Sequence, residues 1–255
     1  MRILICNDDG IDAPGIAVLE AVGKRLSDDV WTVAPDGKRT AGSGSITVGR
    51  PLVMEQRSER RFACSGTPAD SVVTAMTWLF ADKQKPDLVL SGINDGRNVA
   101  EDLIYSGTLG IAREATFWGV PAIGFSRVKN ADVNDADVVW LADLVSRIWS
   151  ARQDWFPEGH YLSVNLPTRL SAAIAEPAFG RDKIGGRSEI TAVDGNRTTI
   201  VVPRGRPGDA GKGKENGLID AGYCTINRLN WFGNLPLGSE RLNAVAPSGV
   251  ADASA

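Results

Sequence analysis

The sequence contains little histidine and little cysteine, and these shortages exclude several kinds of site. Its 255 residues include one histidine, His160, and three cysteines, Cys6, Cys64 and Cys224. One histidine cannot build a multi-histidine zinc site, and the surrounding stretch 157–160 is typical of a surface loop. Three widely spaced cysteines indicate free thiols in a reducing compartment rather than a disulfide framework. Polar chemistry in this chain should therefore depend on carboxylates, amides, hydroxyls, lysines and backbone groups.

The chain also lacks a long apolar run and a strong charge of either sign. No apolar stretch approaches the roughly 20 residues that are needed to span a bilayer. Asp8 and Asp9 interrupt the first apolar segment too early for a signal peptide, so we expect a cytoplasmic protein. A net charge of −3 provides no general attraction to nucleic acids or anionic membranes. We therefore expect neither a nucleic-acid polymer nor a membrane as a partner.

Short apolar runs alternate with segments of helical periodicity, and this pattern predicts an α/β fold. Strands are expected at residues 3–6, 30–34, 46–48, 52–54, 61–64, 87–90, 120–125 and 161–166. Helical spacing is clearest over 16–26, 68–80, 106–118 and 138–149. Because the connections are short, the pattern favours a Rossmann-like, doubly wound and mostly parallel sheet, with 161–166 as its last strand.

The character of the sequence changes at about residue 167. We predict an α/β catalytic core over 1–167, a C-terminal extension over 168–242 and a disordered tail over 243–255. The extension is either part of the same domain or exchanged between subunits. Its segments 190–193 and 198–202 flank an Asp-Gly turn and predict a β-hairpin, which resembles an oligomerisation arm. A closing strand is expected over 223–229.

A pair of carboxylates directly after the first strand is the strongest functional signal. Asp8 and Asp9 follow the buried run 3–6, and helical spacing begins at Ile16. They therefore lie at the carboxyl end of a strand, where open α/β sheets bind their ligands. Neighbouring carboxylates repel unless a cation or strong donors lie nearby, and Mg²⁺ or Mn²⁺ prefers such oxygen ligands. The alternative is an ordinary turn in which Asp9 or Asp12 caps the following helix.

Other strand ends add polar side chains, and the right-handed crossover rule places them at the same edge of the sheet. These side chains are Thr40, Ser43 and Ser45 after the second strand, and Ser91, Asn94, Asp95 and Asn98 after the middle strand. Carboxylate, amide and hydroxyl oxygens form a metal shell with room for water and a phosphate oxygen. The segment Ser106-Gly107-Thr108 begins a helix, where free N–H groups favour an anion. An ordinary serine cap is the alternative there, although a neighbouring metal site favours phosphate.

Several short motifs recur in an order that resembles a known family. They are Asn7–Gly10, Ala34–Asp36 with Arg39 and Thr40, Ser65–Asp70, Ser91–Asn94 with Asn98, Tyr105–Thr108 and Val164–Pro167. Together they resemble the SurE family, the stationary-phase survival proteins that act as 5′/3′-nucleotidases, over about residues 1–167. The resemblance implies a Rossmann-like domain, hydrolysis of nucleoside monophosphates and often of short polyphosphate, and homodimers or homotetramers formed through C-terminal arms.

The resemblance also implies one divalent metal ion per subunit, Mg²⁺ or Mn²⁺. Its metal ligands correspond to Asp8, Asp9, Thr40 and Asn94, and its phosphate contacts to Asn98 and Ser106. The family usually has serine where Thr40 stands, and its usual acidic and threonine residues before the closing strand are replaced by Glu215–Leu218. These departures affect substrate preference and oligomer geometry more than the core chemistry.

The sequence therefore predicts a metal-dependent phosphomonoesterase of the 5′/3′-nucleotidase type. The predicted catalytic residues are Asp8, Asp9, Asn98 and Ser106, and the predicted phosphate-binding residues are Asn98, Ser106, Gly107 and Thr108. Attack on phosphorus by water and attack by an aspartate are both open. The main alternative is a weak or inactive homologue that acts as an oligomeric metal-binding or nucleotide-binding protein.

Two further protein classes fit less well. A response-regulator receiver needs an acceptor aspartate and a lysine at later strand ends, where this chain has Ser91 and Ser126. A dinucleotide-binding oxidoreductase needs a Gly-x-Gly-x-x-Gly turn after the first strand, and this chain has none there. Two acids in that turn would also repel a pyrophosphate.

Overall fold

The computed structural model describes residues 1–131, 133–178, 180, 183–184, 187–202, 206–207 and 213–233. The predicted tail 243–255 lies outside these ranges, as do parts of the C-terminal extension. None of the helices in the described ranges combines the length and the apolar character that crossing a membrane requires.

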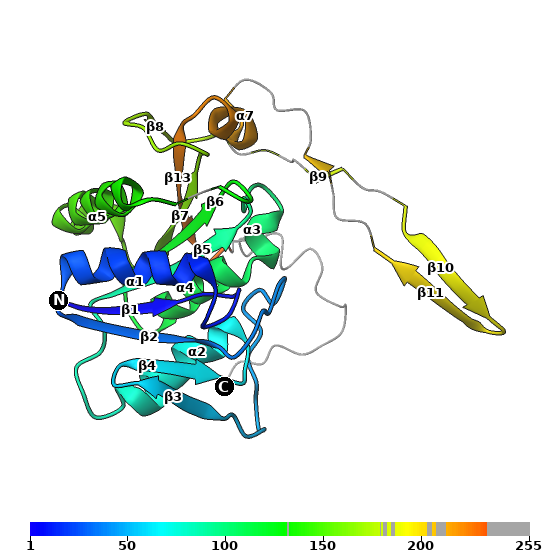
Figure 1. Ribbon diagram of the computed structural model, residues 1–255, viewed down its shortest axis with the longest axis horizontal. Coiled ribbons are helices and arrows are strands. Elements are labelled where there is room, and N and C mark those ends of the chain that lie inside the picture. Colours follow the sequence, from blue (N-terminus) through cyan, green and yellow to red (C-terminus); the bar gives the residue numbers. More distant parts are fainter. Residues whose placement is uncertain are drawn as a thin grey trace, which may run out of the picture.

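A nine-stranded mixed sheet forms the centre of the described structure, in the order β3-β4-β2-β1-β5-β6-β7-β13-β8 (Figure 1). Its strands are β1 (Arg2–Cys6), β2 (Asp29–Pro35), β3 (Met54–Ser58), β4 (Arg61–Cys64), β5 (Leu88–Asp95), β6 (Ala122–Arg127), β7 (His160–Leu166), β8 (Ile174–Ala175) and β13 (Cys224–Asn230). The six strands from β4 to β7 in this order are parallel, whereas β3 and β13 are antiparallel to β4 and β7. The predicted α/β fold with a mostly parallel sheet is confirmed.

Helices cover both faces of this sheet. One face carries α1 (Pro14–Leu26) and α5 (Asp135–Ser150), and the other carries α2 (Pro68–Thr74), the π-helix η1 (Ala75–Leu79) and α4 (Gly107–Phe117). The short helices are α3 (Asp102–Tyr105), α6 (Arg152–Trp155) and α7 (Glu215–Asp220). In β1, Ile3 and Ile5 pack beneath α1, while Leu4 and Cys6 belong to the cluster on the α2 and α4 side. Both faces of β1 are therefore buried, which explains its unbroken apolar sequence.

One helical crossover has the opposite hand to the other three. Helix α1 leads from β1 to β2 in one direction across the sheet, and α2 and α4 lead in the other direction on the opposite face. These three connections therefore share one hand. Helix α5 leads from β6 to β7 in the direction of α4 but packs against α1 (Figure 1). This exception to the right-handed rule brings the loop after β6 beside the beginning of α1.

The C-terminal extension leaves the sheet as an arm and then returns to it. Strands β10 (Glu189–Asp194) and β11 (Arg197–Val201) form a hairpin that projects away from the sheet (Figure 1). Strands β9 (Lys183–Ile184) and β12 (Arg206–Pro207) pair nearer the sheet. The predicted hairpin is confirmed, with Gly195 in the left-handed conformation that its turn requires (φ 55°).

Several expectations from the sequence are wrong, and the strand expected over 52–54 begins only at Met54. Residues 46–48 form no strand, because Thr47 is held instead by Asp70, which accepts hydrogen bonds from the Thr47 N–H and Oγ1 at 2.8 and 2.7 Å. Strand β7 is not the last of the sheet, since β13 and β8 pair beyond it. His160 is half-buried as the first residue of β7, and its ring contacts Phe232 edge-on.

Candidate functional site

Asp8 lies buried between the end of β1 and the beginning of α4. The Thr108 hydroxyl donates a hydrogen bond of 2.6 Å to Asp8 Oδ1. A Cβ atom on Gly107 would lie only 2.9 Å from Asp8 Oδ2, so this approach requires a glycine. Burial raises the pKa of Asp8 to about 6, and the Thr108 hydrogen bond partly opposes this increase while the neighbouring charge of Asp9 adds to it. Such a carboxylate would be stabilised by a cation.

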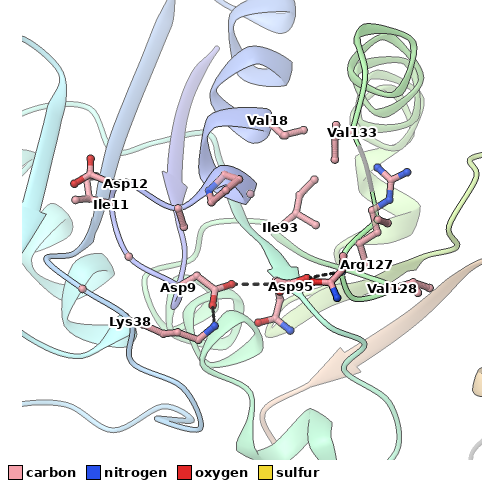
Figure 2. Close-up of a pocket in the computed structure, with 18 of the residues that line it drawn as sticks. Asp9, Ile11, Asp12, Val18, Lys38, Ile93, Asp95, Arg127, Val128 and Val133 are labelled. Carbon is pink, nitrogen blue, oxygen red and sulfur yellow. Dashed lines mark hydrogen bonds and ion pairs between the residues drawn. The ribbon is translucent and has the colours of Figure 1, made fainter.

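Asp9, the next residue, contacts different elements from Asp8. Its Oδ1 forms an ion pair of 2.6 Å with Lys38 Nζ, and its Oδ2 accepts a hydrogen bond from the Asp95 N–H at 3.3 Å. Figure 2 shows Asp9 between Lys38 and Asp95. The hydrogen bond to Asp9 raises the pKa of Lys38, and the charges of Asp95 and Asp8 add to this effect. The acids at this edge of the sheet thus already attract one cation.

The turn that presents the two carboxylates is closed by Asn7. Its Nδ2 donates to the Gly10 carbonyl at 2.8 Å, and its Oδ1 accepts from the Gly10 N–H at 3.1 Å. Gly10 has a φ of 106°, a conformation that side chains other than glycine rarely adopt. Helix α1 has Ala13 at its N-cap and no side-chain cap. The alternative in which Asp9 or Asp12 caps this helix is therefore wrong.

Asn94 follows the buried part of β5, the strand beside β1. Its Nδ2 donates to the Gly96 carbonyl at 2.7 Å. Its Oδ1 accepts no hydrogen bond from the part of the chain that the structure describes. Asn94 and Asp9 both line a cavity of about 850 Å³. An amide oxygen and a carboxylate therefore reach the same cavity.

Helix α4 begins beside Asp8. Ser106 is its N-cap, and the Ser106 Oγ accepts a hydrogen bond from the Leu109 N–H at 3.2 Å, so the capping alternative is observed. The N–H groups of Gly107 and Thr108 come earlier in the helix and have no carbonyl partner within it. Capping by Ser106 therefore leaves the first two N–H groups of α4 available for an anion.

A buried network of side chains holds Asn98. The Asn98 N–H donates to Asn165 Oδ1 at 3.0 Å, and Asn165 Nδ2 donates to the Asn98 carbonyl at 2.8 Å. Asn98 Nδ2 donates to Ser126 Oγ at 2.7 Å. Glu215 Oε1 accepts from Asn165 Nδ2 and from Thr225 Oγ1, each at 2.8 Å. Helix α7 and strand β13 thus support a predicted phosphate-binding residue.

Thr40 is the predicted ligand that the structure connects least to the others. Its side chain is exposed, and the described part of the chain shows no hydrogen bond between Thr40 and Asp8, Asp9 or Asn94. The preceding residue, Arg39, donates its N–H to the Asp8 carbonyl at 2.7 Å. The loop therefore reaches the end of β1 through its backbone, without bringing the Thr40 hydroxyl into contact with the carboxylates.

Comparison with known proteins identifies the family. The family model for the survival protein SurE matches residues 3–185. The chain belongs to the SurE family. It is 42% identical over 195 residues to the 5′-nucleotidase SurE of Paramagnetospirillum magneticum, covering 72% of each chain. It is 38% identical over 188 residues to the 5′-nucleotidase SurE of Nitrobacter winogradskyi, covering 73% of this chain and 69% of the relative.

A solved structure from the SurE family has the same fold. The crystal structure of the SurE protein from Aquifex aeolicus matches with a TM-score of 0.76 and 28% identity. The match covers 96% of this chain and 98% of that one. The structural likeness therefore extends beyond residues 3–185, the part that the SurE family model matches.

The residues present fit the divalent metal that the SurE resemblance implies. Asp8 is a buried carboxylate, Asp9 is paired with an ammonium group, and the Asn94 amide oxygen lines the same cavity as Asp9. Hard divalent cations prefer this set of oxygen ligands. In the described ranges, no cluster of three or more His, Cys, Asp or Glu side chains is placed to hold a metal. An ion here would therefore need amide or hydroxyl oxygens in addition to the two carboxylates.

Three residues of this SurE site were not predicted from the sequence. Lys38 lies in the polar segment after β2, and the sequence does not indicate its pairing with Asp9. Asn165 had a usable signal, because it is a polar residue with a large amide side chain in a strand that is almost wholly buried. Glu215 had none, because it contacts Asn165 from α7, a helix that follows the arm in the sequence.

Proposed function

We propose that this chain is a divalent-metal-dependent phosphomonoesterase that hydrolyses nucleoside 5′- and 3′-monophosphates to nucleoside and phosphate. Short polyphosphate is a further substrate in this proposal. The observation that carries it is the contact between the Asp8 carboxylate and Thr108 at the beginning of α4, 2.6 Å in length. It joins an acidic pair to a helix N-terminus, which favours anions. The relatives named 5′-nucleotidase SurE support a nucleotide as substrate.

In this proposal, Asp8, Asp9, Asn94 and Thr40 hold one Mg²⁺ or Mn²⁺ ion per subunit. A bound ion of this kind polarises the phosphoryl group and lowers the pKa of a bound water. Lys38 Nζ lies 2.6 Å from Asp9 Oδ1, so an ion bound by Asp9 would share this carboxylate with the ammonium group. Thr40 has the least structural support, because its side chain is exposed and unconnected to the other three in the described part of the chain.

The phosphate group is bound by the beginning of α4 and by Asn98. The free N–H groups of Gly107 and Thr108, the Ser106 hydroxyl and the Asn98 amide would contact its oxygens. Negative charge on these oxygens is stabilised by the N–H groups and by the helix dipole. Asn98 is held in position by Asn165 through hydrogen bonds of 3.0 and 2.8 Å.

In this proposal, Asp8 or Asp9 orients the attacking group. We favour water as the nucleophile, with one of the two carboxylates accepting its proton. Attack by a carboxylate would instead form a phospho-enzyme. Acid quenching after mixing with ³²P-labelled nucleotide distinguishes the two routes, because labelled phosphate bound covalently to the protein would contradict attack by water.

Assembly into a homodimer or homotetramer is the second part of the proposal. Ile190, Val193, Ile200 and Val201 of the hairpin are each more than half exposed. An isolated two-stranded hairpin is only marginally stable in water, so a second copy that covers these side chains would stabilise it. Light scattering tests this, and a monomeric mass would contradict it. We place the reaction in the cytoplasm because all three cysteines are buried free thiols.

The decisive experiment measures phosphate release. The substrates are 5′- and 3′-nucleotides, tripolyphosphate and an aryl phosphate, each with Mg²⁺, Mn²⁺ or EDTA. We expect metal-dependent turnover that is lost in Asp8→Asn and retained in Asp82→Asn, a control at an exposed aspartate. Absence of turnover with every metal would contradict the proposal. Retained Mn²⁺ binding under those conditions would then favour the alternative of an inactive, oligomeric homologue.

A further inference from the structure

The cavity beside Asp9 is larger than a phosphate group requires. It has a volume of about 850 Å³, within the range of about 300–1,000 Å³ that is typical of small-molecule sites. It lies between the beginning of α1, the end of β5 and the loop after β6 (Figure 2). The loop after β6 reaches this place because the crossover through α5 has the opposite hand and α5 packs on the same face of the sheet as α1. The fold therefore builds a chamber on the sheet face opposite α4.

One wall of the chamber is apolar. Val18 of α1, Ile93 of β5 and Val128 and Val133 of the loop after β6 line it (Figure 2). α1 packs directly on the end of β5, because a Cβ on Gly15 would overlap the Ile93 carbonyl. An apolar wall of this kind suits a flat ring that is bound by packing rather than by charge.

Charged side chains also line the chamber, and both of its cations form ion pairs with carboxylates. Lys38 pairs with Asp9 at 2.6 Å, and Arg127 pairs with Asp137 at 3.1 Å. Two further lining carboxylates, Asp36 and Asp12, have arginine partners, Arg39 at 2.8 Å and Arg61 at 3.3 Å. In the described structure, both cations that line the chamber therefore already have a carboxylate partner. The chamber therefore suits a neutral group with several hydrogen-bond donors and suits a chain of phosphates poorly.

Arg127 is an unusual part of this wall. Its side chain is buried, and its Nη2 donates to the Thr168 carbonyl at 2.9 Å. Its Nε has no hydrogen-bond partner within the described residues. A buried N–H group without a hydrogen-bond partner lowers the stability of the fold, and a wall with only a structural role gains nothing from it. Asp95, next to it in the lining, accepts the Asn130 N–H at 3.0 Å and presents its carboxylate at the same rim.

We propose that this chamber binds the nucleoside part of the substrate while the phosphate lies at the beginning of α4. The inference rests on the proposed nucleotidase function and extends it to the determinants of substrate choice. The base packs against the apolar wall, and sugar hydroxyls donate hydrogen bonds to the lining carboxylates. Asp9 lies where the two parts meet. Nucleoside monophosphates use both parts of the site, whereas tripolyphosphate uses only the part beside α4.

Filling the chamber tests this proposal. Val133→Trp fills it from the loop after β6, and Val18→Phe fills it from α1. Val139→Trp is the matched control, because Val139 is an exposed valine of α5 that does not line the chamber. We expect Val133→Trp to lower kcat/KM for 5′-AMP at least tenfold, mainly through KM. Hydrolysis of tripolyphosphate and of glycerol 3-phosphate should change less than twofold.

A binding measurement keeps the inference separate from the proposed function. Calorimetric titration with adenosine in EDTA should show binding to the wild type and to Val139→Trp, and none to Val133→Trp. If no substrate is hydrolysed but adenosine binds in this pattern, the proposed function fails and the chamber assignment stands. If nucleotides are hydrolysed but Val133→Trp behaves like Val139→Trp in both assays, the assignment is overturned. Equal losses for tripolyphosphate and 5′-AMP would also overturn it.

Discussion

Replacing Asp8 with asparagine should stabilise the metal-free protein. The Asp8 side chain is 5% exposed, and burial raises its pKa to about 6 from an ordinary value of 3.8. The ionised form is therefore disfavoured in the folded chain. Asparagine is neutral at every pH, has nearly the same shape and keeps an oxygen that can accept the Thr108 hydroxyl. The variant thus removes the charge and retains the contact.

The size and sign of the effect follow from the two pKa values. Well below pH 4, Asp8 is protonated in both the folded and the unfolded chain, and burial of a neutral carboxyl causes no penalty. Between about pH 4 and pH 6, the carboxyl ionises in the unfolded chain but stays protonated in the folded chain, so the penalty grows with pH and is complete above about pH 6. An increase of about two pKa units corresponds to about 3 kcal/mol at 1.36 kcal/mol per unit. The gain in unfolding free energy from Asp8→Asn should therefore rise from near zero to about 3 kcal/mol.

Urea unfolding in EDTA at several values between about pH 4 and pH 8 measures this gain. Thr108→Val is the informative companion, because it removes the hydrogen bond that lowers the pKa of Asp8. The free energy of unfolding should fall between pH 4 and pH 8 in both proteins, and the fall should be larger in Thr108→Val than in the wild type. With saturating Mn²⁺ the order should reverse, since only an intact site gains stability from the ion. A difference between Asp8→Asn and wild type that does not vary with pH would refute the desolvation argument.

Three further predictions concern packing and reactivity. Gly107→Ala should lower the free energy of unfolding by about 1–3 kcal/mol and impair phosphate release, because the added Cβ would lie 2.8 Å from the Asp8 Cβ; normal stability would contradict this. Glu215→Gln should cost about 1–2 kcal/mol in urea unfolding, because a carboxylate oxygen that accepts three hydrogen bonds loses its charge. Burial raises the pKa of all three cysteine thiols, to about 12 for Cys224, so none should react with a thiol reagent at pH 8 before unfolding.

The parts of the fold that local sequence determines were predictable. The run Ile3–Cys6 is apolar because both faces of β1 are buried, and this pattern alone identifies a central strand. Thr67 forms a capping box with Asp70 at the beginning of α2, and Pro68 occupies the first helical position. Ser106 likewise begins α4. In each case the determining contacts lie within a few residues.

The unpredicted parts depend on contacts between distant segments. The hydrogen bond between Glu215 and Asn165 joins residues that the whole arm separates along the chain, and no local pattern specifies it. The face on which α5 packs is likewise decided by its contact with α1, whereas the sequence of α5 shows only that one side is apolar. The apolar wall of the chamber could not be predicted, because it forms only when α5 packs against α1.

The position of the acidic pair explains why the two neighbours have different surroundings. Asp8 contacts α4 on one face of the sheet, and Asp9 lines the chamber that α1 and the loop after β6 form on the other face. A turn closed by Asn7 and Gly10 lies between these faces at the end of β1, and it presents successive side chains to opposite sides. In the proposed reaction, the bond that breaks joins a phosphate on the α4 side to a nucleoside on the α1 side. Two adjacent carboxylates at this turn can therefore contact both parts of one substrate. Because Asp8 is buried on the α4 side, its ionised form lowers the free energy of unfolding of the protein when no metal ion is bound.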